Sequence, residues 1–325
     1  MKLATRANGT PDGELLVVSA DGARGIAAGP AAPNLREALE RWGETAALLA
    51  ELAVEVEMGA GEAIDAATLL APLPRAWQWL DASAFQTHAD LMQIAFGHDP
   101  IRQEKPLMYQ GMSHRFYGPR EDVPFAGEDG GIDFEGEFAV VTDFVPMGTS
   151  AADALGLIRL VMQVNDWSLR HLAVPEMKTG FGWVQAKPAC SAAPFAVTPD
   201  ALGDGWRDGR VCLDLLVDWN GERFGAANGR EMTFGFHELI AHAAATRDLA
   251  AGTIIGSGTV ANTDYARVGS SCISERRAIE MIASSGAPTT GYMKLGDRVR
   301  MAAMDSGGGH PFGVIDQRVV RQSFS

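Results

Sequence analysis

Two glutamates lie two positions apart in the acidic segment Asp133-Phe134-Glu135-Gly136-Glu137, which runs into the apolar stretch Phe-Ala-Val-Val. In a strand, residues i and i+2 point to the same face, so Glu135 and Glu137 would project side by side. Adjacent carboxylates repel each other unless a cation lies between them, and a divalent metal ion with oxygen ligands meets that need. Taken alone, however, this short pattern is more typical of hydrated carboxylates on a solvent-facing strand edge.

A second group of polar residues is the segment 165–170, Asn-Asp-Trp-Ser-Leu-Arg, which directly follows the apolar run Ile-Arg-Leu-Val-Met-Gln-Val. A strand that ends there and turns into a helix would place Asp166 at its C-terminal tip, where functional side chains are common. Arg170 lies one helical turn further on and would face the same pocket. A purely structural helix cap, with Asp166 paired to Arg170, is the alternative.

A third group is an aspartate followed seven residues later by a histidine, Asp81 and His88. Histidine is the usual general base near neutral pH, because its pKa lies within the working range. A lone histidine is otherwise more often a partly buried ring that is hydrogen-bonded to a backbone carbonyl.

Taken together, the three groups resemble the fumarylacetoacetate hydrolase family in their order and spacing along the chain, over roughly residues 73–320. The resemblance implies that His88 is a general base. It also implies a divalent-metal site with four carboxylate ligands: Asp81, Glu135, Glu137 and Asp166. An all-carboxylate ligand set favours Mg²⁺, Mn²⁺ or Ca²⁺ over zinc.

Further matches to the family lie downstream. Lys187, in the segment Gln-Ala-Lys-Pro-Ala-Cys-Ser, falls at a pocket lysine, and Ser191 falls where a threonine near the metal often lies. The segment 252–260, Gly-Thr-Ile-Ile-Gly-Ser-Gly-Thr-Val, resembles a family strand and loop, with Thr259 at a substrate-contacting position. Glu275 is the nearest candidate for the glutamate that assists the histidine, about two residues out of register.

Three departures from the family pattern concern the substrate pocket. Gly97 stands where fumarylacetoacetate hydrolase itself has an arginine, and Ala173 and Met177 stand where it has glutamine and tyrosine. Ser83 replaces a pocket tyrosine and is the expected substrate-binding residue there. Each change removes a polar group that would hold the substrate, so we expect a different, less polar acyl chain than that of fumarylacetoacetate.

The resemblance therefore implies a metal-dependent hydrolase of ketonic substances, which cleaves a carbon–carbon bond in a 1,3-diketo acid of the acylpyruvate or fumarylacetoacetate type. His88 would activate water, the metal would stabilise the enolate, and Lys187 and Arg170 would supply positive charge. A homodimer and a role in the catabolism of aromatic compounds are also implied. The alternatives are a hydratase, decarboxylase or tautomerase of a 2-oxo acid on the same scaffold, or a catalytically silent metal-binding relative.

A loose dinucleotide-binding fingerprint, Gly-Ser-Gly-Thr-Val-Ala at 256–261, is the main competing signal. A nucleotide-binding turn must open a helix within a βαβ unit. The residues that follow, Asn-Thr-Asp-Tyr-Ala-Arg, do not predict a helix, so we set this reading aside.

The elements that must position these residues predict an α+β protein. Three short apolar runs in the first thirty residues predict two or three strands, and residues 35–57 have helical periodicity with a break near Gly43. We expect a small N-terminal α+β domain at 1–72 and a mostly β catalytic domain at 73–325. By resemblance, the latter is a mixed β-sandwich or β-roll. Its only substantial predicted helix begins near Thr233.

The amino-acid composition limits the classes of partner that we expect this protein to bind. The 325 residues are 46% hydrophobic, enough for a large core, and 41 acidic against 27 basic side chains give a net charge of −14. Such a surface repels phosphate backbones and anionic lipids, so we expect a small-molecule substrate, no nucleic acid and no membrane. Three widely spaced cysteines, and a start without a secretory apolar stretch, favour a cytoplasmic location.

Overall fold

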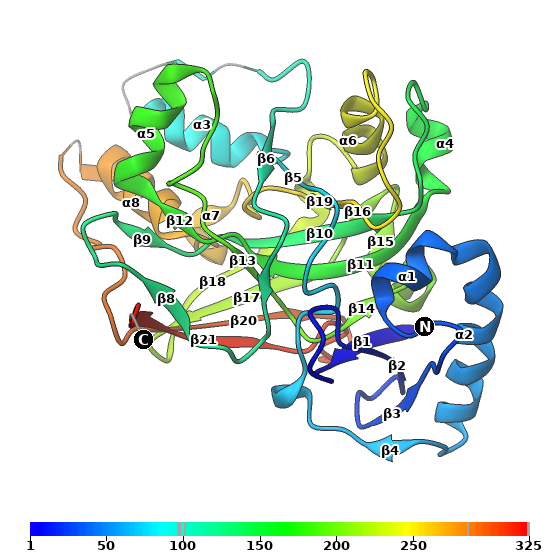
Figure 1. The fold of residues 1–325 in the computed structure, drawn as a ribbon. Helices are drawn as coiled ribbons and strands as arrows, with labels where there is room; N and C mark the ends of the chain where they lie inside the picture. Colours follow the sequence, from blue (N-terminus) through cyan, green and yellow to red (C-terminus); the bar gives the residue numbers. More distant parts are fainter. Residues whose placement is uncertain (96–98, 101, 285, 324–325) are drawn as a thin grey trace.

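The computed structural model describes residues 1–95, 99–100, 102–284 and 286–323, and confirms an α+β fold built mostly of strands (Figure 1). Its largest sheet has twelve strands, with the order β4-β3-β2-β1-β14-β11-β10-β19-β5-β6 and with β13 and β7 attached beside β11. The strands of this sheet are β1 (Lys2–Arg6), β2 (Glu14–Val18), β3 (Arg24–Ala27), β4 (Glu62–Ala63), β5 (Trp79–Ala82), β6 (Met108–Gly111), β7 (Phe116–Tyr117), β10 (Gly136–Thr142), β11 (Ile158–Asn165), β13 (Cys190–Ala192), β14 (Ala196–Val197) and β19 (Ile254–Gly256).

The N-terminal segment continues this sheet. Strand β1 pairs antiparallel with β14 through Lys2 and Val197, and the three predicted N-terminal strands are β1, β2 and β3. The predicted helical region is two helices, α1 (Leu35–Glu40) and α2 (Trp42–Glu57). The break between them lies at Arg41, two residues before the predicted position, because the backbone of Arg41 leaves the helical region there.

A five-stranded sheet lies against the catalytic part of the large sheet, with the order β18-β17-β20-β21-β8. Its strands are β8 (Val123–Phe125), β17 (Asp214–Trp219), β18 (Glu222–Asn228), β20 (Arg298–Met304) and β21 (Ile315–Arg321). The hairpin between β17 and β18 turns at Asn220 and Gly221, whose positive φ angles of 53° and 87° suit the Asn-Gly pair that two-residue hairpin turns favour.

The main core lies between these two sheets. Apolar side chains of both sheets pack there, including Val140 and Val161 from the large sheet and Leu215 and Met301 from the five-stranded one. Gln163 on β11 links the sheets, because its side chain donates to the carbonyl of Met301 and accepts from the amide of Ala303 on β20. This sheet-on-sheet core gives the functional strands a rigid support.

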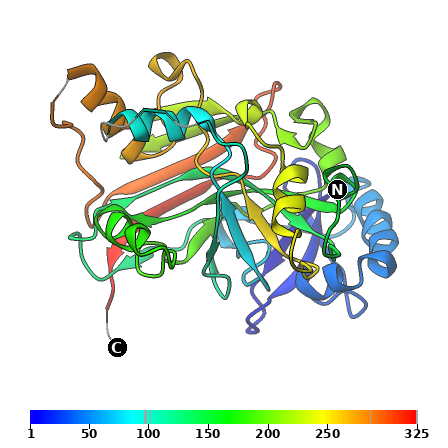
Figure 2. The same ribbon diagram turned by 90° about the horizontal axis from the view of Figure 1, so that it is seen from above.

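Helices cover the ends and edges of the sheets, and Figure 2 shows α3 (cyan) and α8 (orange) side by side. They are α3 (Gln86–Ala95), α4 (Ala151–Leu155), α5 (Arg170–Thr179), α6 (Phe236–Ala243), α7 (Tyr265–Val268) and α8 (Ile273–Ser284). Short 3₁₀ turns lie at η1 (Ala66–Thr68), η2 (Pro199–Gly205) and η3 (Gly229–Glu231), and two small ribbons pair β9 (Ile132–Asp133) with β12 (Ser168–Leu169) and β15 (Trp206–Arg207) with β16 (Arg210–Val211). Within the described ranges, every helix is too short or too polar to cross a bilayer.

Three helix predictions were wrong. The catalytic half has more than one substantial helix, since α3, α5 and α8 have 10, 10 and 12 residues against 8 in α6. Helix α6 is capped at Gly235 and not near Thr233. The segment after the glycine-rich loop forms the four-residue α7, which is still too short for a nucleotide-binding helix. The apolar pattern is weak in α3 and α8, because α3 buries one residue, Leu91, and two of the four buried residues of α8 are polar, Ser274 and Glu275.

Candidate active site

Three carboxylates converge at one end of the large sheet. Asp81 ends β5, Glu137 lies in β10, and Asp166 follows β11 directly. Because β19 pairs with both β5 and β10, these parts of the strands are close in space. One oxygen atom of each carboxylate lies within 4.8 Å of the others, and all three side chains are buried.

The close approach depends on a glycine. A Cβ atom at Gly256 on β19 would lie only 2.3 Å from Oδ1 of Asp81, so a larger residue would displace that carboxylate. Two positions further on, the amide of Gly258 donates to the same oxygen at 3.2 Å. The glycine-rich segment therefore supports an acidic side chain, which explains its pattern without a nucleotide.

Two of the three carboxylates, those of Asp81 and Glu137, form no ion pair with a described cation. Burial, followed by the neighbouring Asp166, raises the pKa of Asp81 well above its ordinary value. Burial and the adjacent Asp81 do the same to the pKa of Glu137. No donor among the described residues reaches either oxygen of Glu137. Buried acceptors without a partner are costly, so this donor set fits a divalent cation with oxygen ligands.

Glu135 has different surroundings. Lys187 Nζ lies 2.5 Å from its Oε1, and Arg170 Nη2 lies 3.1 Å from the same oxygen. The hydroxyl of Ser168 donates to Oε1 and that of Thr259 to Oε2. Burial alone would raise the pKa of Glu135, but Arg170 and Lys187 outweigh it and hold that pKa well below the usual range. Of the four predicted ligands, the structure thus groups three, and it places Glu135 beside them in an ion-paired cluster.

Lys187 connects the two groups. Its ammonium also lies 2.5 Å from Oδ2 of Asp166. Burial opposes its charge, but Asp166 and Glu135 overcome that effect and raise the pKa of Lys187. The lysine therefore stays protonated, and two of its three N–H groups are occupied by carboxylates.

Arg170 is anchored by an aspartate that the sequence did not single out. Its Nε donates to Oδ2 of Asp133 at 2.7 Å, which contradicts the alternative in which Arg170 pairs with Asp166. The carboxylate of Asp133 also accepts the first backbone amides of α8, from Ile273 at 2.7 Å and Ser274 at 2.9 Å. Asp133 thus joins the acidic strand to a helix N-terminus. Its place two positions before Glu135 was the available signal.

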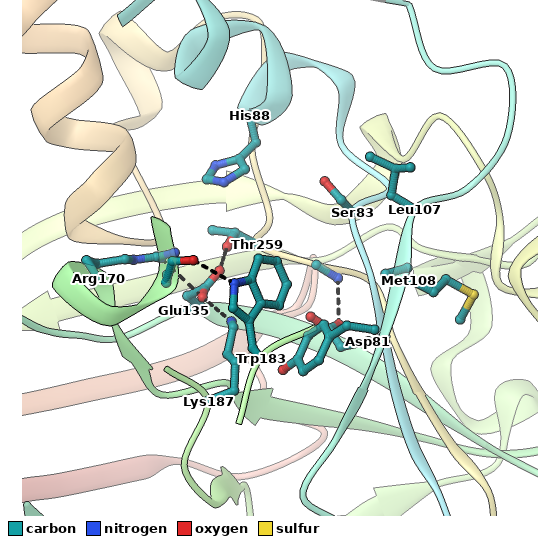
Figure 3. A pocket seen from close by; sticks show the side chains of 14 residues that line it. Asp81, Ser83, His88, Leu107, Met108, Glu135, Arg170, Trp183, Lys187 and Thr259 are labelled. Atoms are coloured by element: carbon teal, nitrogen blue, oxygen red, sulfur yellow. Dashed lines mark hydrogen bonds and ion pairs between the residues drawn. The ribbon is translucent and has the colours of Figure 1, made fainter. Parts of the chain in front are cut away.

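Helices α3 and α8 bring His88 and Glu275 together. The Nδ1 atom of His88 lies 2.8 Å from Oε2 of Glu275, whose side chain is fully buried. The second ring nitrogen, Nε2, has no hydrogen bond to any described residue, and His88 lines the pocket (Figure 3). Glu275 was the nearest sequence candidate for this partner, and the helix packing brings it within hydrogen-bond distance.

The pocket is a cavity of about 240 Å³ above these groups. Ser83 and Thr259, both predicted to bind substrate, are among its lining residues. Ser191 is not: it is buried in β13, where its hydroxyl accepts from the indole of Trp167 at 2.9 Å. Of the departures from the family, Ala173 lines the cavity, Met177 is 58% exposed, and Gly97 lies outside the described residues.

Other pocket residues had no signal in the sequence. Tyr109 on β6 donates to Oδ2 of Asp166 at 2.7 Å, and its ring contacts Trp183 edge-to-face at 5.1 Å. The thiol of Cys190 donates to Oδ1 of Asp166 at 2.9 Å. Tyr109 is a single residue in an unremarkable segment, and Cys190 lies between Lys187 and Ser191 in a segment where the sequence pointed only to those two residues. The sheet pairing brings both to Asp166.

Comparisons with known proteins agree with this architecture. The family model described as fumarylacetoacetate (FAA) hydrolase C-terminal matches residues 78–320, and the one described as fumarylacetoacetase N-terminal domain 2 matches residues 1–75. A solved structure of maleylpyruvate hydrolase from Sphingobium sp. SYK-6, in complex with manganese(II) and pyruvate, has a TM-score of 0.66 at 18% identity. That comparison covers 99% of this chain and 100% of the other.

Two curated proteins match in sequence. A 2,4-didehydro-3-deoxy-L-rhamnonate hydrolase of Sphingomonas sp. (strain SKA58) is 29% identical over 163 residues, 49% of this chain and 54% of that protein. A mitochondrial oxaloacetate tautomerase of Rattus norvegicus is 27% identical over 159 residues, 48% of either chain. The chain thus spans about half the length of the curated relatives it matches. Since the C-terminal family model covers well over half of the chain, the protein belongs to the fumarylacetoacetate hydrolase family.

Proposed function

We propose that this protein is a metal-dependent hydrolase that cleaves a carbon–carbon bond in a 1,3-diketo acid of the acylpyruvate type. The observation that carries the proposal is the hydrogen-bonded pair His88–Glu275. His88 lines the same pocket as Asp81, whose carboxylate lies within 4.8 Å of those of Glu137 and Asp166. A general base beside a group of metal-ligating oxygens is the combination that hydrolysis of a diketone requires.

Asp81, Glu137 and Asp166 would hold the cation, and Glu135 is the predicted fourth ligand beside them. Oxygen ligands suit Mg²⁺, Mn²⁺ or Ca²⁺. When bound, the ion would polarise the substrate oxygens and stabilise negative charge on the leaving enolate. The structure of maleylpyruvate hydrolase, which has a similar fold, contains manganese(II) and pyruvate. It supports an acylpyruvate as the substrate, because cleavage of an acylpyruvate releases pyruvate.

His88 and Glu275 would move the proton. Nε2 of His88 removes a proton from water, whose oxygen bonds to the acyl carbonyl carbon, while Glu275 accepts from Nδ1–H and stabilises the charged ring. When the carbon–carbon bond breaks, its electron pair goes to the methylene of the 2-oxo acid, and the proton returns to that carbon. An acylpyruvate and one water thus give one carboxylic acid and one pyruvate.

Lys187 and Arg170 would supply fixed positive charge. The third N–H of Lys187 is free of the two carboxylate contacts, and the residue lines the pocket, so it can donate to a substrate oxygen as charge develops there. Trp183 and Tyr109 flank the ammonium, at 5.8 and 5.3 Å from the ring centres, and keep it within this region.

A tautomerase of a 2-oxo acid is the second candidate, because one matching relative bears that name. The same histidine could move a proton between carbon and oxygen without adding water. Hydratases and decarboxylases of 2-oxo acids were alternatives on the same scaffold, but no specific observation favours either activity. The homodimer, the cytoplasmic location and a place in aromatic-compound catabolism stay predictions.

The test is metal-dependent product analysis. The chelator-treated protein, reloaded with Mg²⁺, Mn²⁺ or Ca²⁺, would be assayed with acylpyruvates, fumarylacetoacetate-like diketo acids, 2-hydroxydienoates and oxaloacetate. Release of two acids from a diketone supports the hydrolase. Enol–keto interconversion of oxaloacetate without cleavage of any diketone would replace it with the tautomerase, and no turnover with tight metal binding would indicate a silent relative.

His88→Ala separates the base from the metal site. We expect kcat to fall by roughly 10³-fold, the usual contribution of general base catalysis, with unchanged metal affinity by calorimetry. His242→Ala, at an exposed position on α6, is the matched control and should keep full activity. A fully active His88→Ala variant would refute the assigned role.

A further inference from the structure

The cations of the pocket are already paired with carboxylates of the protein. Among the described lining residues, the permanently charged cations are Arg170 and Lys187. Arg170 is bound by Asp133 and Glu135, and Lys187 by Glu135 and Asp166. The charge of each is thus largely balanced by the protein, and a second carboxylate held by both N–H groups of a fork or by the whole ammonium would have to displace a buried ion pair, which is costly.

The described part of the wall opposite Arg170 is apolar and consists of Leu107 and Met108. Ala173 and Trp183 add apolar surface elsewhere in the lining, with Trp183 beside Lys187. The indole N–H of Trp183 is used internally, because it donates to the carbonyl of Ala173 at 3.0 Å. In Figure 3, Leu107, Met108 and Ser83 lie on the side opposite Arg170, and the Ser83 hydroxyl is the one polar side-chain group labelled among them.

The balance of buried charge is negative even with a divalent ion bound. Asp81, Asp133, Glu135, Glu137 and Asp166 are all buried acids, and two cations face them. A carboxylate at the far end of a bound substrate would therefore lie near excess negative charge, against an apolar wall, without a partner. An unpaired buried charge is among the most unfavourable groups in a protein site.

We propose that the acyl end of the substrate is uncharged, an aliphatic or aromatic group, so that the pocket selects 2,4-diketo monoacids over the corresponding diacids. This inference rests on the proposed function for its reaction, but the specificity is a property of the pocket wall. Leu107, Met108 and Ala173 are the residues that set it.

The first experiment compares two substrates of equal length, 2,4-dioxooctanoate and 2,4-dioxooctanedioate, which differ in a terminal methyl or carboxylate. We expect kcat/KM to favour the monoacid by ~10-fold or more, as for a polar group left without a partner. Equal rates, or a preference for the diacid, would overturn the proposal.

A binding measurement separates this outcome from failure of the proposed function. 2-Oxohexanoate and 2-oxoadipate have six carbons each and lack the bond that would be hydrolysed. Calorimetry with Mn²⁺-loaded protein should give the monoacid the lower Kd by ~10-fold. If no diketone is cleaved but this preference holds, the proposed reaction is wrong and the pocket specificity stands. Tighter binding of 2-oxoadipate, or no binding of either acid, would overturn the specificity.

A positive charge placed at the apolar wall should abolish the preference for the monoacid. Leu107 is 60% exposed at the edge of the cavity, so Leu107→Arg adds a guanidinium without burying it in the core. We expect the ratio of monoacid to diacid affinity to fall by roughly 10-fold. Met147→Arg adds the same charge at a 61% exposed position outside the cavity lining and should leave the ratio unchanged. Equal shifts in both variants would mean that overall charge, and not the wall, sets the preference.

Discussion

Two neighbouring groups of buried carboxylates have opposite electrostatic surroundings. Asp81 and Glu137, with Asp166 beside them, have pKa values raised by burial and by one another. Glu135 lies beside them on the acidic strand, but Arg170 and Lys187 hold its pKa well below the usual range. In the first group, the carboxylate triad, Asp166 is paired with Lys187, but Asp81 and Glu137 need a cation from solution. The second group, the ion-paired cluster, is neutralised by the chain itself.

One acidic segment of the chain supplies carboxylates with two different functions. Glu135 and Glu137 are two residues apart, and the backbone amide of Glu135 is fixed by the side chain of Asn165 at 2.9 Å. This rigid support keeps one carboxylate with the cations and leaves the other open. The cluster can therefore position Arg170 and Lys187 at the pocket, while the triad remains available for metal. Each prediction below changes one group and uses the other as reference.

Glu137→Gln should have the largest effect, because it replaces a carboxylate of the triad, neither of whose oxygens has a described partner, with a neutral amide. We expect activity to fall by 10³-fold or more, about the several kcal/mol that a metal contributes to charge stabilisation. Metal affinity, measured by calorimetry, should fall as well. The metal-free variant should unfold at a temperature no lower than that of the wild type, since a neutral amide relieves repulsion in the triad. A clear drop in that temperature would show that Glu137 is structural.

Glu135→Gln should act in the opposite way, on stability without metal. It removes the anionic partner of Lys187 and of Arg170, so two buried cations lose compensation. Breaking a buried pair in this way costs roughly 3 kcal/mol or more of unfolding free energy, which urea unfolding in the presence of chelator can measure. Glu55→Gln, at an exposed position on α2, is the control and should change little. A loss no larger than the control's would contradict the division into triad and cluster.

The two groups should also give opposite pH slopes. Asp81 and Glu137 have raised folded pKa values, so the folded metal-free chain holds more protons than the unfolded chain above about pH 4 to 5. Stability should therefore fall as pH rises through this range, by about 1.4 kcal/mol per pH unit for each extra proton. Glu135 has a lowered folded pKa, and its contribution is present above its unfolded value and is lost on acidification.

Urea unfolding from pH 5 to 7.5, in chelator and in saturating Mg²⁺, checks this sign. Metal should abolish the fall in stability, because a bound cation replaces the protons of the triad. Glu137→Gln should reduce the slope in chelator, because one of the two titrating groups is gone. A slope that is the same with and without metal would show that other groups dominate.

Sequence reasoning recovered the triad better than its surroundings. Asp81, Glu137 and Asp166 became candidates together through the resemblance to the family, because the spacing of the two glutamates alone favoured a solvent-facing strand edge. The same reasoning treated Glu135 as equivalent to Glu137, because spacing alone contains no information on which cation lies nearby.

What the sequence did not predict is set by long-range packing. Asp133, Tyr109 and Cys190 contact the site only because strands and helices distant in the chain meet there, such as α8 at Asp133 across 140 residues. The helices α3 and α8 were missed because their apolar patterns are weak. Ser191, expected near the substrate, instead lies beneath Trp167, because its position in β13 turns it into the core.

Tyr109→Phe should give the smallest effect and refine the boundary between the two groups. Burial raises the pKa of Tyr109, so its hydroxyl stays a neutral donor to Oδ2 of Asp166 at 2.7 Å. Lys187 donates to the same oxygen and remains in the variant. We therefore expect metal affinity to fall by only ~10-fold, the low end for loss of a group that orients a ligand.

Calorimetric titration of Mn²⁺ into the chelator-treated variant measures that loss, with Tyr265→Phe on α7, outside the pocket lining, as the control. If the affinity does not change, Lys187 and Cys190 orient Asp166 without Tyr109. If it falls as far as in Glu137→Gln, the hydroxyl of Tyr109 belongs to the metal site itself. An intermediate loss supports the arrangement described above, in which Asp166 belongs to the triad but is oriented from both sides.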